Sequence, residues 1–170
     1  MKKLLLFLFV TFCCVEIHAQ NNDLWQRTTS NSALNKRTSS ADSGKLYYKL
    51  NSDFLKRKLA ATTGKASQEM ASEITIPNSD GVLERFTVWQ SSNFAPELQA
   101  KYPEIRAYEG SGLDDKSAKI HFSVSPSGIQ TMVFRADKVT EFIEVNPDNK
   151  TEYVLFAKNG SSSKKLICKT

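Results

Sequence analysis

Histidine and cysteine are scarce in this sequence, which has two histidines and three cysteines in 170 residues. After Ala19, only His121 and Cys168 are left. A catalytic zinc site takes three protein ligands, usually histidines, and a serine or cysteine nucleophile needs a partner base. We therefore expect that residues 20–170 have no catalytic activity and bind no cofactor of their own. A single thiol forms no internal disulfide, so a hydrophobic core must stabilise the fold.

Motifs for phosphate, zinc and nucleic acid are also missing. The sequence has no Gly-rich phosphate loop and no His-Glu-x-x-His motif. Its net charge of +5 is mild, and its longest basic run is Lys56-Arg57-Lys58. A nucleic-acid surface requires a basic face with interleaved aromatic residues. We therefore expect no nucleic-acid partner.

The first nineteen residues have the features of a secretory signal peptide. Lys2 and Lys3 precede the apolar run Leu4–Val15, and Ala19 supplies the small residue for cleavage before Gln20. The run is shorter than the roughly 20 apolar residues of a membrane-spanning helix. We therefore expect a secreted protein without a stable membrane anchor. Lipid attachment at Cys13 or Cys14 is the alternative, which the bulky residue Phe12 disfavours.

The chain then divides into three parts. Residues 20–44 are rich in Ser, Thr and Asn, which indicates an extended lead-in. Residues 45–158 carry the patterns of a folded domain, and 159–170 are expected to be a flexible tail that includes Cys168. Within the domain, residues 45–50 predict a strand, and Asn51 or Ser52 is expected to cap a helix with a stripe of apolar residues.

Hairpin signals dominate the rest of the domain. Asp80-Gly81 separates two strand-like runs, residues 73–77 and 83–89. Residues 119–125 alternate strictly and return as 129–135 after a Pro-Ser-Gly turn, and residues 142–145 and 152–157 predict two more strands. Pro96 and Pro103 bound a short helix, with Leu98 and Tyr102 expected to face inward.

These patterns predict a single α+β domain with six or seven strands in a mostly antiparallel sheet and two short helices. The connections are too short for parallel crossovers. The residues expected in the core are Ile120, Phe122, Val124, Met132, Phe134, Val154 and Phe156.

Few side chains suggest chemistry. His121 shares a strand face with Ser123 and Ser125, but same-face neighbours two residues apart are about 7 Å apart, so a surface histidine is favoured. The acidic residues Asp114, Asp115 and Asp137 lack the ligand spacing of a calcium loop, which favours a turn. Glu104 and Glu109 are no better placed.

The central run resembles the N-terminal pro-region of secreted, reprolysin-like (metzincin) zinc metalloproteases of flavobacterial type. The segments that carry the resemblance are Pro77–Gly81, Glu84–Phe86, Ser91–Leu98, Lys101–Ile105, Tyr108, Gly110–Gly112, Asp114-Asp115 and His121–Ser125. The resemblance extends over about residues 46–168. It implies a pro-domain that assists folding of the protease and keeps the zymogen latent. The zinc then belongs to a catalytic domain, and this chain is expected to be the truncated precursor or a solitary copy.

Cys168 lies where the resemblance implies a latch. A thiolate is a strong zinc ligand and fills the position that the catalytic water needs. The sequence Leu166–Thr170 lacks the proline and glycine that flank the latch cysteine of better-known metzincins, so a thiol without this role is the alternative. For the whole chain, the alternative is a stand-alone secreted binding or protease-inhibitor module.

Overall fold

The computed structural model describes residues 23–28, 44–62, 70–91 and 94–158. These residues form one antiparallel sheet and two short helices, as the sequence predicts. The strands are β1 (Trp25–Thr28), β2 (Leu46–Leu50), β3 (Ser72–Pro77), β4 (Leu83–Ser91), β5 (Arg106–Gly112), β6 (Lys119–Ser125), β7 (Gly128–Arg135), β8 (Lys138–Val145) and β9 (Tyr153–Lys158). The helices are α2 (Ser52–Ala60) and α3 (Pro96–Lys101). The α+β fold class is confirmed.

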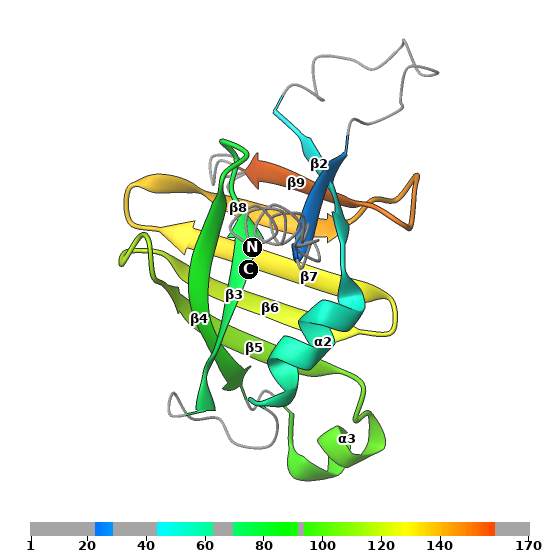
Figure 1. Cartoon of the computed structure of the whole chain (residues 1–170). Helices are drawn as coiled ribbons and strands as arrows, with labels where there is room; N and C mark the ends of the chain where they lie inside the picture. Colours follow the sequence, from blue (N-terminus) through cyan, green and yellow to red (C-terminus); the bar gives the residue numbers. More distant parts are fainter. Residues whose placement is uncertain (1–22, 29–43, 63–69, 92–93, 159–170) are drawn as a thin grey trace, which may run out of the picture.

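The sheet is a continuous antiparallel meander from β3 to β9. Its spatial order is β1-β2-β9-β8-β7-β6-β5-β4-β3. Sheet twist and coiling bring the two edge strands towards each other, and the indole Nε1 of Trp25 in β1 donates a hydrogen bond of 2.8 Å to the carbonyl oxygen of Thr75 in β3. Figure 1 shows β3 and β4 crossing the direction of β6–β8 at a steep angle, with α2 on the same side of the sheet. The inner face of this curved sheet therefore encloses the core.

The two ends of the curved sheet differ. One end, here called the polar end, carries the turns β3–β4, β5–β6 and β7–β8. The other end, here called the mouth, carries the turns β6–β7 and β8–β9, and helix α2 starts there as β2 finishes. The alternating direction of the strands fixes this arrangement.

The β3–β4 hairpin forms around the predicted turn. Gly81 has φ of 80°, a left-handed conformation that glycine adopts without a steric penalty. The Asn78 side-chain oxygen accepts hydrogen bonds from the backbone N–H groups of Asp80 (3.0 Å) and Val82 (2.9 Å). The turn residues thus satisfy their own backbone groups, which fixes the register of β3 on β4.

Helix α2 begins as the sequence predicts, because Asn51 is its N-cap. The Asn51 Oδ1 accepts a hydrogen bond of 3.0 Å from the backbone N–H of Phe54. Leu55 and Leu59 are buried and form the apolar stripe of the helix. Packing of this stripe keeps a nine-residue helix stable where an isolated one would be marginal.

The predicted orientation of α3 is wrong. Leu98 and Tyr102 are 43% and 38% exposed, and no residue of this helix is buried. Its link to the domain is polar instead: the Gln99 side-chain amide donates to the carbonyl oxygens of Tyr102 (3.1 Å) and Ile105 (3.0 Å). These bonds satisfy carbonyl groups just after the helix, and its side chains add nothing to the buried core.

The predicted face of β7 is also wrong at Met132, which is 37% exposed. The two-residue turn Pro126-Ser127 pairs Ser125 with Gly128, which places Thr131 opposite Phe122 and Val133 opposite Ile120. Directly opposed residues share a face, so Thr131 and Val133 join the core and Met132 turns outward. Of the other expected core residues, Ile120 and Phe122 are buried in the core and Val124 packs against it. The prediction is wrong for Phe134 and Phe156, which are partly buried on the outer face, where they stack on His121 and Phe142. Val154 is buried but does not belong to the core cluster.

Nine strands are present in the described part of the chain, whereas six or seven were predicted. β1 lies inside the expected lead-in, where Trp25 is 3% exposed and anchors it. β5 was not predicted because its glycines interrupt the alternation of apolar and polar side chains that indicates a strand. A Cβ on Gly110 would lie 2.4 Å from the carbonyl oxygen of Thr87, so the close approach of β4 and β5 requires glycine at this position.

The core fills the concave side of the sheet with aliphatic and aromatic residues. Trp25 makes edge-to-face contacts with Tyr48 and Tyr153, at ring-centroid distances of 6.2 and 5.7 Å. Tyr108 and Phe122 stack at 4.9 Å. Neither helix of the described residues is long and apolar enough to span a bilayer.

Candidate functional site

The predicted latch and cleavage residues, Cys168, Ala19 and Gln20, lie outside the described residues. The structure therefore bears only on the candidates inside the domain. Among the residues it describes, no group of three His, Cys, Asp or Glu side chains is arranged to hold a metal ion.

His121 and Ser123 lie on the outer face of β6, as their alternation predicts. The His121 ring stacks on Phe134 at 5.6 Å. Phe134 lies opposite Lys119, which precedes His121 by two residues in β6, whereas Ser123 follows His121 by two residues. The stack on Phe134 therefore turns the imidazole away from Ser123. The hydroxyl of Ser125 contacts the Ser127 hydroxyl at 2.8 Å and donates to the Gly128 carbonyl at 3.1 Å. These contacts form no nucleophile–base pair.

The acidic residues Asp114 and Asp115, for which the sequence favours a turn over a calcium loop, form turn and ion-pair contacts. The Asp114 Oδ1 lies 2.7 Å from the Arg85 Nη2, and its Oδ2 accepts from the Arg85 backbone N–H at 2.7 Å. These hydrogen bonds lower the pKa of the Asp114 carboxyl. Asp115 accepts from the backbone N–H and hydroxyl of Ser117, which lowers its pKa as well. Asp137 is exposed in the β7–β8 turn.

An ionic cluster occupies the polar end of the curved sheet. It consists of Arg135 with three carboxylates, those of Glu84, Glu141 and Asp115, and is called the Arg135 cluster below. The Arg135 Nη1 lies 2.7 Å from the Glu141 Oε2, its Nη2 contacts the Glu84 Oε2, and its Nε lies 3.3 Å from the Asp115 Oδ2. The side chains of Arg135, Glu141 and Glu84 are 2%, 6% and 12% exposed, so water screens these pairs little.

Neighbouring turns donate hydrogen bonds to the two buried carboxylates of the cluster, whereas the buried Arg135 Nε has an ion-pair contact with Asp115 and no hydrogen bond. The Ser79 backbone N–H donates to the Glu141 Oε1 and the Asn78 side chain donates to the Glu84 Oε1, both at 2.8 Å. Burial by itself would raise the pKa of Glu141, but hydrogen bonds from Ser79 and Arg135 hold it below its usual value. The cluster thus joins the β3–β4 turn to β7 and β8 and closes the polar end.

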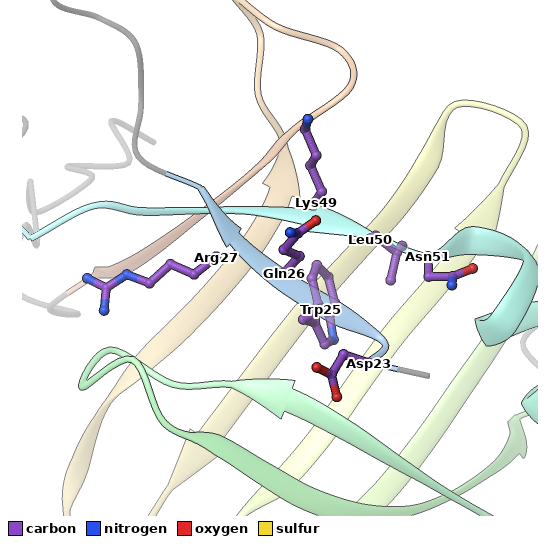
Figure 2. A pocket seen from close by; sticks show the side chains of 7 residues that line it. All are labelled: Asp23, Trp25, Gln26, Arg27, Lys49, Leu50 and Asn51. Atoms are coloured by element: carbon purple, nitrogen blue, oxygen red, sulfur yellow. The ribbon is translucent and has the colours of Figure 1, made fainter. Parts of the chain in front are cut away.

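The β1–β2 ribbon borders a hollow of about 550 Å³. Figure 2 shows its lining, in which Arg27 and Lys49 extend in different directions and Asp23 lies near Trp25. The two cations do not converge, and the Trp25 indole is hydrogen-bonded to Thr75.

The outer face of the sheet carries a continuous row of large side chains, called the outer row below. The pairing register places one member on each strand from β4 to β9: Trp89, Glu109, His121, Met132, Phe142 and Phe156. The Trp89 Nε1 donates to the Glu109 Oε1 at 2.8 Å, and Phe142 stacks on Phe156 at 5.6 Å. Aromatic residues and methionine are enriched in protein interfaces, so the outer row is the candidate contact surface.

Comparison with protein-family models, with curated proteins and with solved structures finds no match to this chain. The residues themselves therefore carry the functional argument.

Sequence reasoning missed both the Arg135 cluster and the outer row. The sequence feature that could have indicated the faces of β7 is the Pro126-Ser127 turn. A two-residue turn fixes which residues of β6 and β7 lie opposite each other. That register places Arg135 on the inner face and Met132 on the outer face.

Proposed function

We propose that this chain is the pro-domain of a secreted, reprolysin-like zinc metalloprotease, where it assists folding of the protease and holds it latent. The observation that carries the proposal is the resemblance of residues 77–125 to pro-regions of that family. This run corresponds to the β3–β4 turn and strands β4, β5 and β6. The charged residues Arg85 and Asp114 in this run contact each other, so they contribute to the fold.

The zinc belongs to the partner in this proposal. The module contributes a folded surface, and the outer row is the part of that surface best suited to a protein partner. Its Met132 is 37% exposed on a sheet face opposite to α2. Exposed apolar side chains beside half-buried aromatic rings offer the desolvated contact area that interface centres require.

The second element of the proposal is the thiolate latch at Cys168. β9 ends at Lys158, ten positions before Cys168, and a chain of that length reaches at most about 36 Å. That reach is comparable to the diameter of a small domain, so a thiol at this position is within range of a cleft beside the module. The thiolate would occupy the zinc position that catalytic water needs.

Two measurements test the proposal on residues 20–170 and a related catalytic domain. The first is refolding of the denatured catalytic domain with and without the module, where we expect a higher yield of active protease with it. The second is inhibition of the folded catalytic domain, where Cys168→Ser should weaken inhibition strongly, because a hydroxyl is a poorer zinc ligand than a thiolate. Acid should weaken it too, since the thiol must lose its proton to bind.

The outcomes separate the alternatives. Inhibition without any gain in refolding would indicate a stand-alone inhibitor module. Full potency of Cys168→Ser would refute the latch and leave inhibition by the domain surface. Absence of both effects with several related catalytic domains would refute the pro-domain proposal.

A further inference from the structure

A cavity of about 360 Å³ lies at the mouth of the curved sheet, between α2 and the β6–β7 turn. Its volume falls in the range of small-molecule sites, which often occupy the mouths of β-barrels. The residues that line it are Leu50, Ser52, Leu55, Lys56, Glu104, Val124, Ser125, Pro126, Gly128, Ile129 and Tyr153. The Arg135 cluster lies at the opposite, polar end of the curved sheet and shares no residue with this cavity.

The deep wall of this cavity is apolar. Leu55 and Ile129 are each 3% exposed, and Leu50 and Val124 pack against the core around them. Tyr153, which is 7% exposed, contributes an aromatic residue to the lining. A ligand body in this cavity would therefore leave water for hydrocarbon and aromatic contacts.

The rim of the cavity is cationic on the α2 side. Lys56 lines the cavity, whereas the cations of Arg57 and Lys58 lie over the Phe54 ring, at 5.7 and 5.6 Å. Among the lining residues, Lys56 carries the one positive charge and Glu104 the one negative charge. An anionic head group is favoured where it meets the Lys56 ammonium.

We propose that the mouth cavity binds a small amphiphilic anion of the medium-chain fatty-acid class. Its apolar chain lies between Leu55, Val124 and Ile129, and its carboxylate meets the Lys56 ammonium at the rim. The charge pair fixes the orientation and the chain supplies most of the affinity. This site lies on the inner side of the sheet, away from the outer row, and does not depend on the proposed protease partner.

The test is titration calorimetry of residues 20–170, which contain every described element, with decanoate and with uncharged decanol. We expect saturable 1:1 binding of decanoate and about tenfold weaker binding of decanol, which lacks the charge pair with Lys56. Lys56→Glu should weaken decanoate binding by at least about tenfold for the same reason. Lys58→Glu is the matched control, since it makes the same charge change on the same helix outside the cavity, and it should leave binding almost unchanged.

A methyl-resolved NMR titration locates the ligand independently of any variant. Decanoate should shift the methyl signals of Leu55, Val124 and Ile129, and Val124→Phe, which fills the cavity, should abolish those shifts while the spectrum stays folded. Absence of saturable decanoate binding would overturn the proposal. Equal affinity for decanol, equal effects of Lys56→Glu and Lys58→Glu, or shifts confined to methyl groups outside the cavity would each overturn it as well.

Discussion

Replacing Arg135 by methionine should strongly destabilise the domain. The substitution keeps an unbranched apolar chain of similar length but removes the guanidinium from Glu84 and Glu141, which are 12% and 6% exposed. Their remaining partners are the Asn78 amide and the Ser79 backbone N–H. Removing one partner of a buried ion pair costs about 3–5 kcal/mol because the other charge stays buried and uncompensated. That loss is a large share of a typical stability of about 5–15 kcal/mol.

Urea unfolding followed by tryptophan fluorescence measures the effect. With a denaturant slope of about 2 kcal/mol per molar, a loss of about 4 kcal/mol moves the midpoint down by about 2 M. The matched control is Arg85→Met, which removes the same group from an exposed pair with Asp114, where the side chains are 54% and 39% exposed. Solvent screening makes that pair weak, so the control should shift the midpoint far less.

A rescue variant isolates the electrostatic cause. Glu141→Gln in the Arg135→Met background removes one of the buried, uncompensated charges and should recover part of the lost stability. The reasoning is refuted if Arg135→Met shifts the midpoint no more than Arg85→Met, or if the Glu141→Gln rescue lowers stability further.

Four further results are expected. Stability should fall as pH drops below 4.5, the ordinary pKa of Glu141, because the pKa of Glu141 is lower in the folded state and the unfolded chain takes up the proton first. Urea midpoints measured from pH 7 to 3 should show this decline, and Glu141→Gln should make the decline smaller. Gly110→Ala should cost about 2 kcal/mol in thermal unfolding, since its Cβ would meet a carbonyl oxygen at 2.4 Å, and a wild-type melting curve would contradict this. Met132→Glu should weaken binding of a related catalytic domain without lowering stability, whereas Val139→Glu, at a site 40% exposed outside the outer row, should not; equal effects would argue against the outer row. Residues 20–170 alone should not cleave casein with or without zinc, and chelator-sensitive cleavage would overturn the non-catalytic assignment.

Local sequence signals were sufficient for the fold class and most elements. The Asp80-Gly81 turn, the Asn51 cap and the alternation of residues 119–125 each depend on neighbouring residues, and each occurs as predicted. Strand β5 was missed because close packing against β4 selects glycine at Gly110, which removes the periodic side chains that indicate a strand.

The candidate sites depend on contacts between residues far apart in sequence, which explains why they were less predictable. Arg135 contacts Glu84, which lies 51 positions away in the sequence, and no local pattern pairs the two residues. In β7, hydrophobicity alone favours Met132 and Phe134 as buried residues. The register set by the turn instead places Thr131 and Val133 on the inner face. Tertiary register here overrides local hydrophobicity.

The most direct test of the pro-domain account is a titration of an active, related metzincin catalytic domain with residues 20–170, monitored by hydrolysis of a peptide substrate. The account predicts that activity falls as module is added and reaches its minimum near one equivalent, and that Met132→Glu requires more module for the same inhibition. Undiminished activity at excess folded module, across several related catalytic domains, would contradict it.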